Sequence, residues 1–553
     1  MNGLHLKYVN EEYDAAGVLC KYTFNIPEDF NFSYDVVDEL ARLSPDRTAM
    51  VWLSEDGEEH RFSFADMKRQ SDKAAALLHG LGVRKGDKVM LVLKRHYQFW
   101  FAILACHKLG AVAIPATHLL TAKDFSYRFH AASVKALICT IDGDAAACAE
   151  AGAAEYGQLD VKLIARCGTA ARSTPVRAGW LDFDAGLEAA GDWQRPETRA
   201  ADPMLLYFTS GTTGHPKMVL HNNTYALGHL MTAKHWQNVQ PDGLHFTISD
   251  TGWGKAVWGK LYGQWLMEAA VFTYDFNRFV PADLLPLFAK YQITTFCAPP
   301  TMFRIFIKED LSKYDLSSLK YAAIAGEALN PEVFNQFYES TGLKLMEGFG
   351  QTETTCLIAN LTHMEPRPGS MGKPVPQYEV LIVDEGGQEV PAGTTGEIVV
   401  RTEPRPVGLF LGYYRDEALT SRVWHDGLYH TGDTAWRDEA GYLWYVGRTD
   451  DIIKSSGYRI GPFEIESALM EHPAVLECAV TGAPDPDRGT VVKATIILTK
   501  GYEPTDALAK ELQQHVKKQT APYKYPRIVE FVDALPKTIS GKIRRAVIRK
   551  EID

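Results

Sequence analysis

The sequence predicts an α/β protein with a large N-terminal domain of mainly parallel sheets, a β-rich subdomain within it, and a small α+β domain at the C-terminus. Three observations support this prediction. Short apolar strands alternate with helical stretches before residue 370, strands joined by glycine-rich turns follow, and a smaller alternation begins after residue 450. We therefore place one domain at 1–449, with the subdomain at about 370–447, and a second domain at 450–553.

The clearest unit of the first domain lies between residues 88 and 115. Lys88–Leu93 is a short apolar run, Gln98–Leu109 is apolar on most sides, and Ala111–Pro115 is a second apolar run. Strand, helix and strand within about thirty residues are typical of a βαβ unit with parallel strands. Similar runs predict further strands at 136–139, 161–164, 205–208, 294–298 and 321–325.

The last third of the chain predicts a different order of helices and strands. Strands of the subdomain are expected at 378–383, 396–400 and 442–446. In the C-terminal domain we expect a helix from about Pro462, strands at 475–480 and 491–498, a helix at 506–519, and a strand at 528–532.

Composition excludes several classes of function. The net charge of −11 gives no global field that would attract nucleic acid or an anionic membrane. No apolar run is long enough to span a bilayer, and the first residues lack a basic region followed by an apolar core. Eight scattered cysteines without CxxC pairs indicate reduced thiols and no zinc site. We expect a cytoplasmic protein without membrane insertion, and leave a homodimer open.

The most informative stretch is Thr209-Ser210-Gly211-Thr212-Thr213-Gly214-His215-Pro216-Lys217, which follows the apolar run 204–208. Its glycines let backbone N–H groups turn toward one anion, and its hydroxyls and Lys217 add hydrogen bonds and charge. It is not a Walker loop, because only two residues separate the glycines and Met218 follows the lysine. We interpret it as a polyphosphate-binding loop, with a flexible turn as the alternative.

Further motifs follow in a fixed order. They are Ala325-Gly326-Glu327-Ala328-Leu329, Glu347-Gly348-Phe349-Gly350-Gln351-Thr352-Glu353-Thr354, Tyr429-His430-Thr431-Gly432-Asp433, Gly447-Arg448-Thr449-Asp450-Asp451-Ile452-Ile453-Lys454 with Ser456-Gly457-Tyr458-Arg459-Ile460, and the closing Leu535-Pro536-Lys537-Thr538-Ile539-Ser540-Gly541-Lys542-Ile543-Arg544. Together with the 209–217 loop they resemble the adenylate-forming enzymes, which include acyl-CoA synthetases, peptide-synthetase adenylation domains and luciferases. The resemblance runs from about residue 40 to the end, and is strongest to the medium-chain acyl-CoA synthetases.

The resemblance implies an ATP-dependent acid:CoA ligase that uses Mg²⁺ and coenzyme A and acts on a small carboxylic acid. The loop would hold the β- and γ-phosphates of ATP, residues 326–328 the adenine, and Asp433 both ribose hydroxyls. Thr352 would bond the α-phosphate, Glu353 would hold Mg²⁺, and Arg448 would support the ribose–phosphate end. The implied ATP-binding set is Thr209, Ser210, Gly211, Thr212, Thr213, Gly214, Lys217, Gly326, Glu327, Ala328, Phe349, Gly350, Gln351, Thr352, Asp433 and Arg448.

Each of these residues also has a structural alternative. Glu327 could be an acid in the first turn of a helix, Asp433 a turn residue, and Glu353 a solvated surface acid.

The resemblance assigns catalysis to Lys542, with Thr352 and Glu353. A cation between the acid's carboxylate and the α-phosphate would lower the barrier between two anions. The alternative is a solubilising basic tail. Asp450 stands where the family has its hinge, which implies a mobile C-terminal domain. A second arrangement of the C-terminal domain would present Gly457, Tyr458 and Arg459 to coenzyme A, with Lys454 as a further candidate. The alternative is a plain hairpin turn at 456–457.

The acyl pocket is less well defined. The segment Asp250–Lys255 resembles the acyl-pocket segment of related synthetases, and we expect the pocket to involve Trp253, Gly254, Lys255, Cys297, Ala325 and Gly350, with Trp236 as a further candidate. Acetyl-CoA synthetases have Trp where this chain has Gly350, so we expect an acid longer than acetate, or a branched or aryl acid. Lys255 either faces away or bonds a polar group of the acid.

Two rival functions remain open at this point. One is an adenylating enzyme that loads the pantetheine of a carrier protein or makes another acyl product. The other is a non-catalytic nucleotide sensor on the same fold, against which the presence of Lys542, Glu353 and Asp433 argues.

Overall fold

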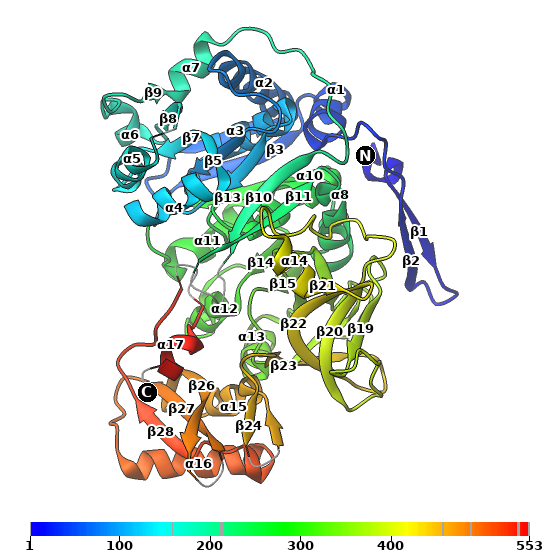
Figure 1. The fold of residues 1–553 in the computed structure, drawn as a ribbon, viewed down its shortest axis with the longest axis vertical. Coiled ribbons are helices and arrows are strands. Elements are labelled where there is room, and N and C mark those ends of the chain that lie inside the picture. The colour runs from blue at the N-terminus through cyan, green and yellow to red at the C-terminus, as the bar shows by residue number, and fades with distance from the viewer. Residues whose placement is uncertain are drawn as a thin grey trace.

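A computed structural model of the chain describes residues 2–157, 159–209, 215–455, 458–486, 489–538 and 542–550. Figure 1 shows a large body and a smaller C-terminal domain, with the hairpin of β1 (Val9–Tyr13) and β2 (Leu19–Phe24) projecting from the large body. None of the helices within the described ranges has the length and apolar character needed to cross a bilayer.

A seven-stranded sheet forms one layer of the large body, in the order β11-β10-β6-β5-β7-β8-β9. All its neighbouring strands are parallel except β10 and β11. The strands are β5 (Lys88–Val92), β6 (Val112–Pro115), β7 (Val134–Thr140), β8 (Val161–Ala165), β9 (Leu181–Asp182), β10 (Pro203–Thr209) and β11 (Lys217–Asn222). The predicted βαβ unit is confirmed, since α3 (Gln98–Leu109) joins β5 to β6 and is buried along its whole length.

A fourteen-stranded sheet forms the second layer and continues into the β-rich section. Its parallel part contains β3 (Thr48–Ser54), β12 (Leu244–Thr247), β13 (Ala270–Asp275), β14 (Thr295–Ala298), β15 (Tyr321–Ile324) and β16 (Leu345–Gly350), with β4 (Glu59–Ser63) antiparallel at the edge. Its antiparallel part contains β17 (Cys356–Ala359), β18 (Ser370–Pro374), β19 (Val380–Val383), β20 (Thr395–Arg401), β21 (Trp424–His425), β22 (Leu428–Arg437) and β23 (Leu443–Arg448).

The β-rich section is therefore joined to the main body through its hydrogen bonds and its core. β16, the last parallel strand, pairs antiparallel with β17, which pairs with β18. Ile398 and Leu443 belong to the same hydrophobic core as Leu91 and Leu205 of the first sheet. Residues of both sheets consequently meet around one region between the layers.

The remaining helices of the large body lie between and over the sheets. They are α1 (Glu39–Leu43), α2 (Phe64–Gly80), α4 (Ala122–Ala132), α5 (Ala145–Tyr156), α6 (Thr169–Ser173), α7 (Phe183–Ala189), α8 (Tyr225–Leu230), α9 (Gly254–Lys260), α10 (Tyr262–Leu266), α11 (Pro281–Tyr291), α12 (Pro300–Phe306), α13 (Pro331–Thr341) and α14 (Glu417–Val423). α2 and α4 begin with capping boxes, in which the hydroxyls of Ser63 and Thr121 accept from the backbone three residues ahead.

The C-terminal domain has a hydrophobic core of its own, formed by residues such as Ile465, Leu469, Val480, Val492 and Leu512. Its elements are β24 (Ile453–Ser455), β25 (Tyr458–Ile460), α15 (Pro462–Met470), β26 (Val475–Asp485), β27 (Gly489–Leu498), α16 (Asp506–Gln519), β28 (Ile528–Phe531) and α17 (Arg545–Lys550). The predicted helices and strands of this domain are present, but β26 extends five residues further than expected because it pairs along its length with β27.

Candidate functional site

Asp433 is the centre of a buried polar cluster. It lies inside β22 opposite Arg448 of β23, and only 5% of its surface is exposed. Gln351 donates to its Oδ2 and, at 2.9 Å, to the Thr431 carbonyl. Tyr445 donates to Oδ1 at 3.1 Å, and the Arg448 guanidinium lies 3.4 Å from Oδ2. Burial raises the pKa of Asp433, and the charge of Arg448 opposes this rise. The alternative that Asp433 is a turn residue is therefore wrong.

The Gln351–Glu353 turn connects this cluster to the phosphate loop. The Thr352 carbonyl accepts from His221 Nε2 at 2.7 Å, and His221 belongs to β11, which begins at Lys217. Glu353 is half-buried, and its Oε1 accepts from the Tyr413 hydroxyl at 2.8 Å. The Lys217 ammonium lies 5.1 Å from the centroid of the same tyrosine ring. Glu353 and Lys217 therefore share one neighbour.

Residues 210–214 of the predicted phosphate loop lie outside the described residues. The two ends of the loop are described, and Thr209 pairs with Lys217 across β10 and β11.

The Gly326–Ala328 segment begins two residues after the end of β15. Gly326 has a φ of +116°, a conformation that favours glycine. The Glu327 carboxylate pairs with Arg304 of α12 at 3.0 Å. Because α13 starts at Pro331, Glu327 is not in the first turn of that helix, and this alternative is wrong. Glu347 of β16 anchors the segment, since its Oε1 accepts from the Leu329 backbone at 3.2 Å.

Lys255 projects from α9 toward the end of β15. Its ammonium donates to the Ala325 carbonyl at 2.6 Å and lies 5.6 Å from the ring centroid of Trp258. Burial lowers the pKa of Lys255. Cys297, at the end of β14, is also buried, and burial raises the pKa of its thiol. Lys255 thus links α9 to the residue that follows β15.

Gly350 has a backbone reason to be glycine. A Cβ at this position would lie 2.3 Å from the Thr355 carbonyl oxygen, so the two segments could not approach as they do. Phe349 packs near the ring of Tyr445, with centroids 6.4 Å apart. Trp236 is buried under β16, where its indole donates to the Met346 carbonyl at 2.9 Å. Gly254 begins α9, and Trp253, the N-cap residue of this helix, is half-buried.

Lys542 belongs to the C-terminal domain, and its side chain is exposed. Its positive charge is a minor influence on the pKa of Asp433, which burial raises, and on the pKa of Lys255, which burial lowers.

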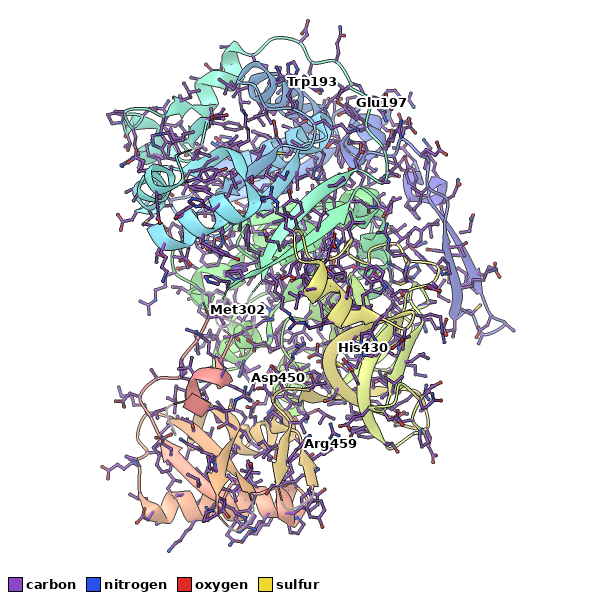
Figure 2. All side chains as sticks on the ribbon, in the orientation of Figure 1. Trp193, Glu197, Met302, His430, Asp450 and Arg459 are labelled. Atoms are coloured by element: carbon purple, nitrogen blue, oxygen red, sulfur yellow. The ribbon has the colours of Figure 1, made fainter. Side chains whose placement is uncertain are left out.

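The predicted hinge lies where the large body meets the small domain, and Figure 2 labels Asp450 there. Its carboxylate lies 3.7 Å from Arg448, and its carbonyl accepts from Arg549 of α17 at 3.2 Å. Gly457 lies outside the described residues. Tyr458 is exposed and stacks on Tyr523 with centroids 4.0 Å apart.

Arg459 is occupied elsewhere in this arrangement of the domains. It pairs at 2.6 Å with Glu385, which lies between β19 and β20. Figure 2 places Arg459 in the small domain, below Asp450. Neither Arg459 nor Tyr458 contacts the cluster around Asp433.

Sequence reasoning missed several neighbours of the site. Tyr413 contacts Lys217 and Glu353, and Tyr429 donates to Gln351 Oε1 at 2.6 Å. The other missed neighbours are His221, Tyr445 and Trp258. Tyr429 belongs to the recognised 429–433 motif but was given no role, and Tyr445 stands just before the 447–454 motif. Both could have been inferred from strand alternation. Tyr413 lies in no recognised motif.

Comparisons with known proteins agree with this geometry. Residues 37–414 match the family model of the AMP-binding enzyme, and residues 464–542 match that of the AMP-binding enzyme C-terminal domain. Acyl-coenzyme A synthetase ACSM3, mitochondrial, of Mus musculus is 42% identical over 96% of this chain and 92% of its own length. Acyl-coenzyme A synthetase ACSM5, mitochondrial, of Homo sapiens is 43% identical over 95% of this chain and 91% of its own.

Solved structures show the same likeness. The anthranilate CoA ligase AuaEII in complex with anthranoyl-AMP has a TM-score of 0.86 at 28% identity, covering 95% of this chain and 98% of its own. The Brucella canis acyl-CoA synthetase has a TM-score of 0.72 at 30% identity, covering 95% of this chain and 94% of its own. The chain therefore belongs to the AMP-binding enzyme family and, within it, to the acyl-CoA synthetases.

Proposed function

We propose that this ligase converts a medium-chain, branched or aryl carboxylic acid to its CoA thioester through an acyl-adenylate, releasing AMP and pyrophosphate. The observation that carries the proposal is the buried carboxylate of Asp433, which Gln351, Tyr445 and Arg448 hold in place. Lys542 would supply the cation between the nucleotide and the acid.

The nucleotide end would hold ATP. Asp433 would accept hydrogen bonds from the ribose hydroxyls, and its fixed orientation between Tyr445 and Arg448 supports that role. The adenine would lie against residues 326–328, and the polyphosphate in the 209–217 loop. Thr352 would bond the α-phosphate.

The carboxylate of Glu353 fits Mg²⁺, which prefers oxygen ligands, and the Tyr413 hydroxyl holds it in one orientation. When bound, Mg²⁺ would neutralise phosphate charge.

In the first step a carboxylate oxygen of the acid attacks the α-phosphorus, and pyrophosphate leaves. Lys542 would stand between the two anions and stabilise the charge that shifts during this attack. In the second step the C-terminal domain rotates about Asp450, and residues 457–459 with Lys454 face coenzyme A. The thiol then attacks the acyl carbonyl, and AMP leaves.

The acyl end would be formed by Trp253, Gly254, Lys255, Cys297, Ala325 and Gly350. The bond from Lys255 to the Ala325 carbonyl occupies the ammonium, so the lysine stem can border an apolar acyl group. Small side chains at Cys297 and Ala325 support an acid longer than acetate. The close approach of Gly350 to the Thr355 carbonyl supplies a second reason for glycine at this position.

The direct experiment is an acid screen. The enzyme is incubated with Mg-ATP, coenzyme A and acids of two to twelve carbons, including branched and aromatic members. Pyrophosphate, AMP and the thioester are then measured. We expect all three in equal amounts, with acids longer than acetate preferred. Formation of ADP, or no thioester with any acid, would contradict the proposal.

For the compartment we propose the cytoplasm, although the two relatives above are named as mitochondrial. Cell fractionation tests this, and size-exclusion chromatography tests whether the enzyme is a homodimer.

A further inference from the structure

An imidazole and a carboxylate face each other beside the 250–255 segment. His118 follows β6 of the first sheet, and Asp250 follows β12 of the second. The His118 Nδ1 and the Asp250 Oδ2 are 3.4 Å apart. Both atoms are buried, and neither has another hydrogen-bond partner in the described part of the chain. Each atom is therefore the available hydrogen-bond partner of the other. A small rotation of the imidazole ring would bring them to hydrogen-bond distance.

Two further contacts fix the carboxylate of Asp250. Its Oδ1 accepts from the Gly252 backbone at 2.8 Å, and the Arg95 guanidinium lies 3.7 Å from its Oδ2. Burial tends to raise the pKa of Asp250, but the interaction with His118 and the charge of Arg95 outweigh it and lower the pKa. Asp250 is therefore a fixed anion at neutral pH.

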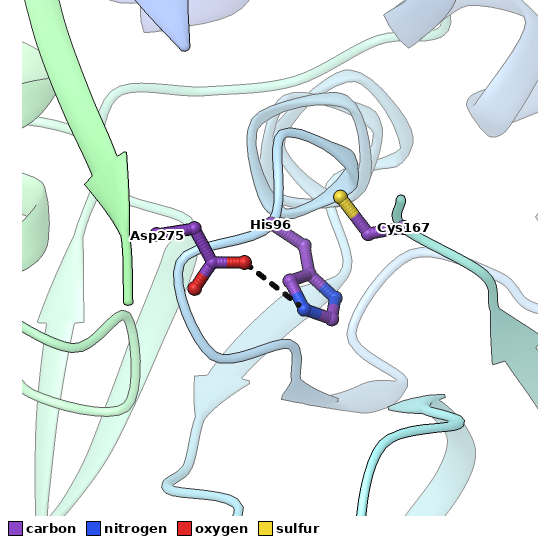
Figure 3. Close-up of side chains that lie close together, drawn as sticks. All are labelled: His96, Cys167 and Asp275. Carbon is purple, nitrogen blue, oxygen red and sulfur yellow. Dashed lines mark ion pairs between the residues drawn. The ribbon is translucent and has the colours of Figure 1, made fainter. Parts of the chain in front are cut away.

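Arg95 in turn belongs to an ionic cluster that supports this region. It lies 3.6 Å from Asp275, which is 3.4 Å from His96 Nε2 (Figure 3). His96, Asp275 and Cys167 bring ligand-capable atoms within 4.8 Å of one another. Because Arg95 already supplies positive charge to the Asp275 carboxylate, we interpret the cluster of His96, Asp275 and Cys167 as an ionic support and not as a metal site.

His118 stands close to the acyl end of the site. A Cβ on Gly252 would lie 2.3 Å from the Thr117 backbone nitrogen, so the loop that carries His118 lies directly against the residue before Trp253. The His118 side chain is 27% exposed while Nδ1 is buried. Nδ1 is among the buried atoms without a hydrogen bond and Nε2 is not, so the exposed part of the ring includes Nε2.

We propose that His118 is the general base of the thioester-forming step, with Asp250 as its positioning residue. This inference rests on the proposed function. The arrangement has the logic of other nucleophile-activating pairs, in which a carboxylate orients one ring nitrogen and the other takes a proton. At neutral pH a thiol with a pKa of about 8.5 is only a few per cent thiolate, so a base at this point raises the reactive fraction.

The step balances without any further reactant. His118 Nε2 accepts the proton of the CoA thiol while the sulfur forms a bond to the acyl carbonyl carbon. The bond from that carbon to the phosphate oxygen breaks, and AMP leaves with the electron pair. The imidazolium, stabilised by Asp250, then releases its proton to solvent. Asp250 is the charged group that the described structure pairs with the ring, and Arg95 lies 3.7 Å from the Oδ2 of Asp250.

The test separates the two half-reactions of wild-type enzyme and His118→Gln. Adenylation is followed by pyrophosphate exchange with acid and ATP, and thioester formation by supplying acyl-adenylate and coenzyme A from pH 6.5 to 9.5. We expect adenylation within twofold of wild type. At pH 7 the kcat for thioester formation should fall about 10²- to 10⁴-fold, with little change in the KM for coenzyme A. The deficit should shrink as the pH approaches about 8.5, where the thiol ionises unaided.

His425→Gln is the matched control. His425 is an exposed histidine paired at 2.9 Å with Asp426 in the β-rich section, and its loss should leave both half-reactions unchanged.

Asp250→Asn should lower the thioester kcat less than His118→Gln, with the same recovery at high pH. Retention of the thioester rate in His118→Gln, equal loss of both half-reactions, or a higher KM for coenzyme A without pH-dependent recovery would each overturn the inference. If the wild-type enzyme itself makes no thioester from acyl-adenylate, the proposed function fails first, and this inference with it.

Discussion

Glu347 supports the site through the backbone of a neighbouring segment. It lies in β16, is 4% exposed, and holds the Gly326–Ala328 segment through the Leu329 backbone. Burial raises the pKa of Glu347 to about 8. The folded protein therefore keeps a proton that the unfolded chain loses near pH 4.5, and Glu347 costs stability as the pH rises between these values.

Glu347→Gln should remove this pH dependence. The variant keeps an oxygen for the Leu329 N–H but cannot ionise. Between pH 5 and 8 its unfolding free energy should gain on wild type by up to about 1.4 kcal/mol per pH unit. Thermal or denaturant unfolding of both proteins over this range measures the effect, and parallel pH curves would contradict it.

At the residue scale, the sequence predicted which residues carry the chemistry better than it predicted their contacts. The motifs named Gln351, Asp433 and Arg448, and the structure brings them together. Tyr413 and His118 could not be found in this way. Their roles depend on which loops the two sheets place side by side, and single-sequence patterns do not specify that pairing.

At the scale of elements, the local sequence pattern determined most boundaries of helices and strands. α3 begins at Gln98 and ends at Leu109 as predicted, because a strongly apolar helix is bounded by Gly110 in the left-handed conformation. The pairing of strands that are distant in the sequence was not predictable in the same way. The continuation of the parallel strands into β17 and β18 depends on the close approach at Gly350, which requires knowledge of both partners.

Gly252 gives an element-scale prediction, with Gly254 as the matched control. A Cβ at Gly252 would lie 2.3 Å from the Thr117 nitrogen, whereas the nearest atom to one at Gly254 is 3.9 Å away. Gly252→Ala should destabilise the protein by about 1–3 kcal/mol, because two backbone segments must separate. Gly254→Ala should change stability by less than about 0.5 kcal/mol. Denaturant unfolding tests this, and equal effects of the two substitutions would contradict it.

At the scale of the whole molecule, side-chain contacts join the two domains in the arrangement described above. Arg459 pairs with Glu385 of the large body, and Asn330 donates to the Ser467 carbonyl at 3.2 Å. Arg459 is also a candidate contact of coenzyme A after rotation. The domain boundary at Asp450 and the rotation itself stay predictions.

Glu385→Gln should weaken this arrangement. Since an exposed ion pair is weak and both arrangements must be accessible, we expect adenylation to slow by roughly two- to fivefold and thioester formation not to slow. The effect should fade at high salt. Glu389→Gln is the control, because Glu389 pairs with Arg437 at 3.0 Å within the β-rich section. Equal slowing of both half-reactions would count against a domain contact.

Lys542→Ala, measured in both half-reactions, tests the proposed mechanism most sharply. In this mechanism one cation stands between the acid and the nucleotide during adenylation only. The variant should therefore lose acid-dependent pyrophosphate exchange by at least about a hundredfold, and should still convert supplied acyl-adenylate and coenzyme A to thioester at close to the wild-type rate. Adenylation that survives the substitution, or equal loss of both half-reactions, would contradict the account.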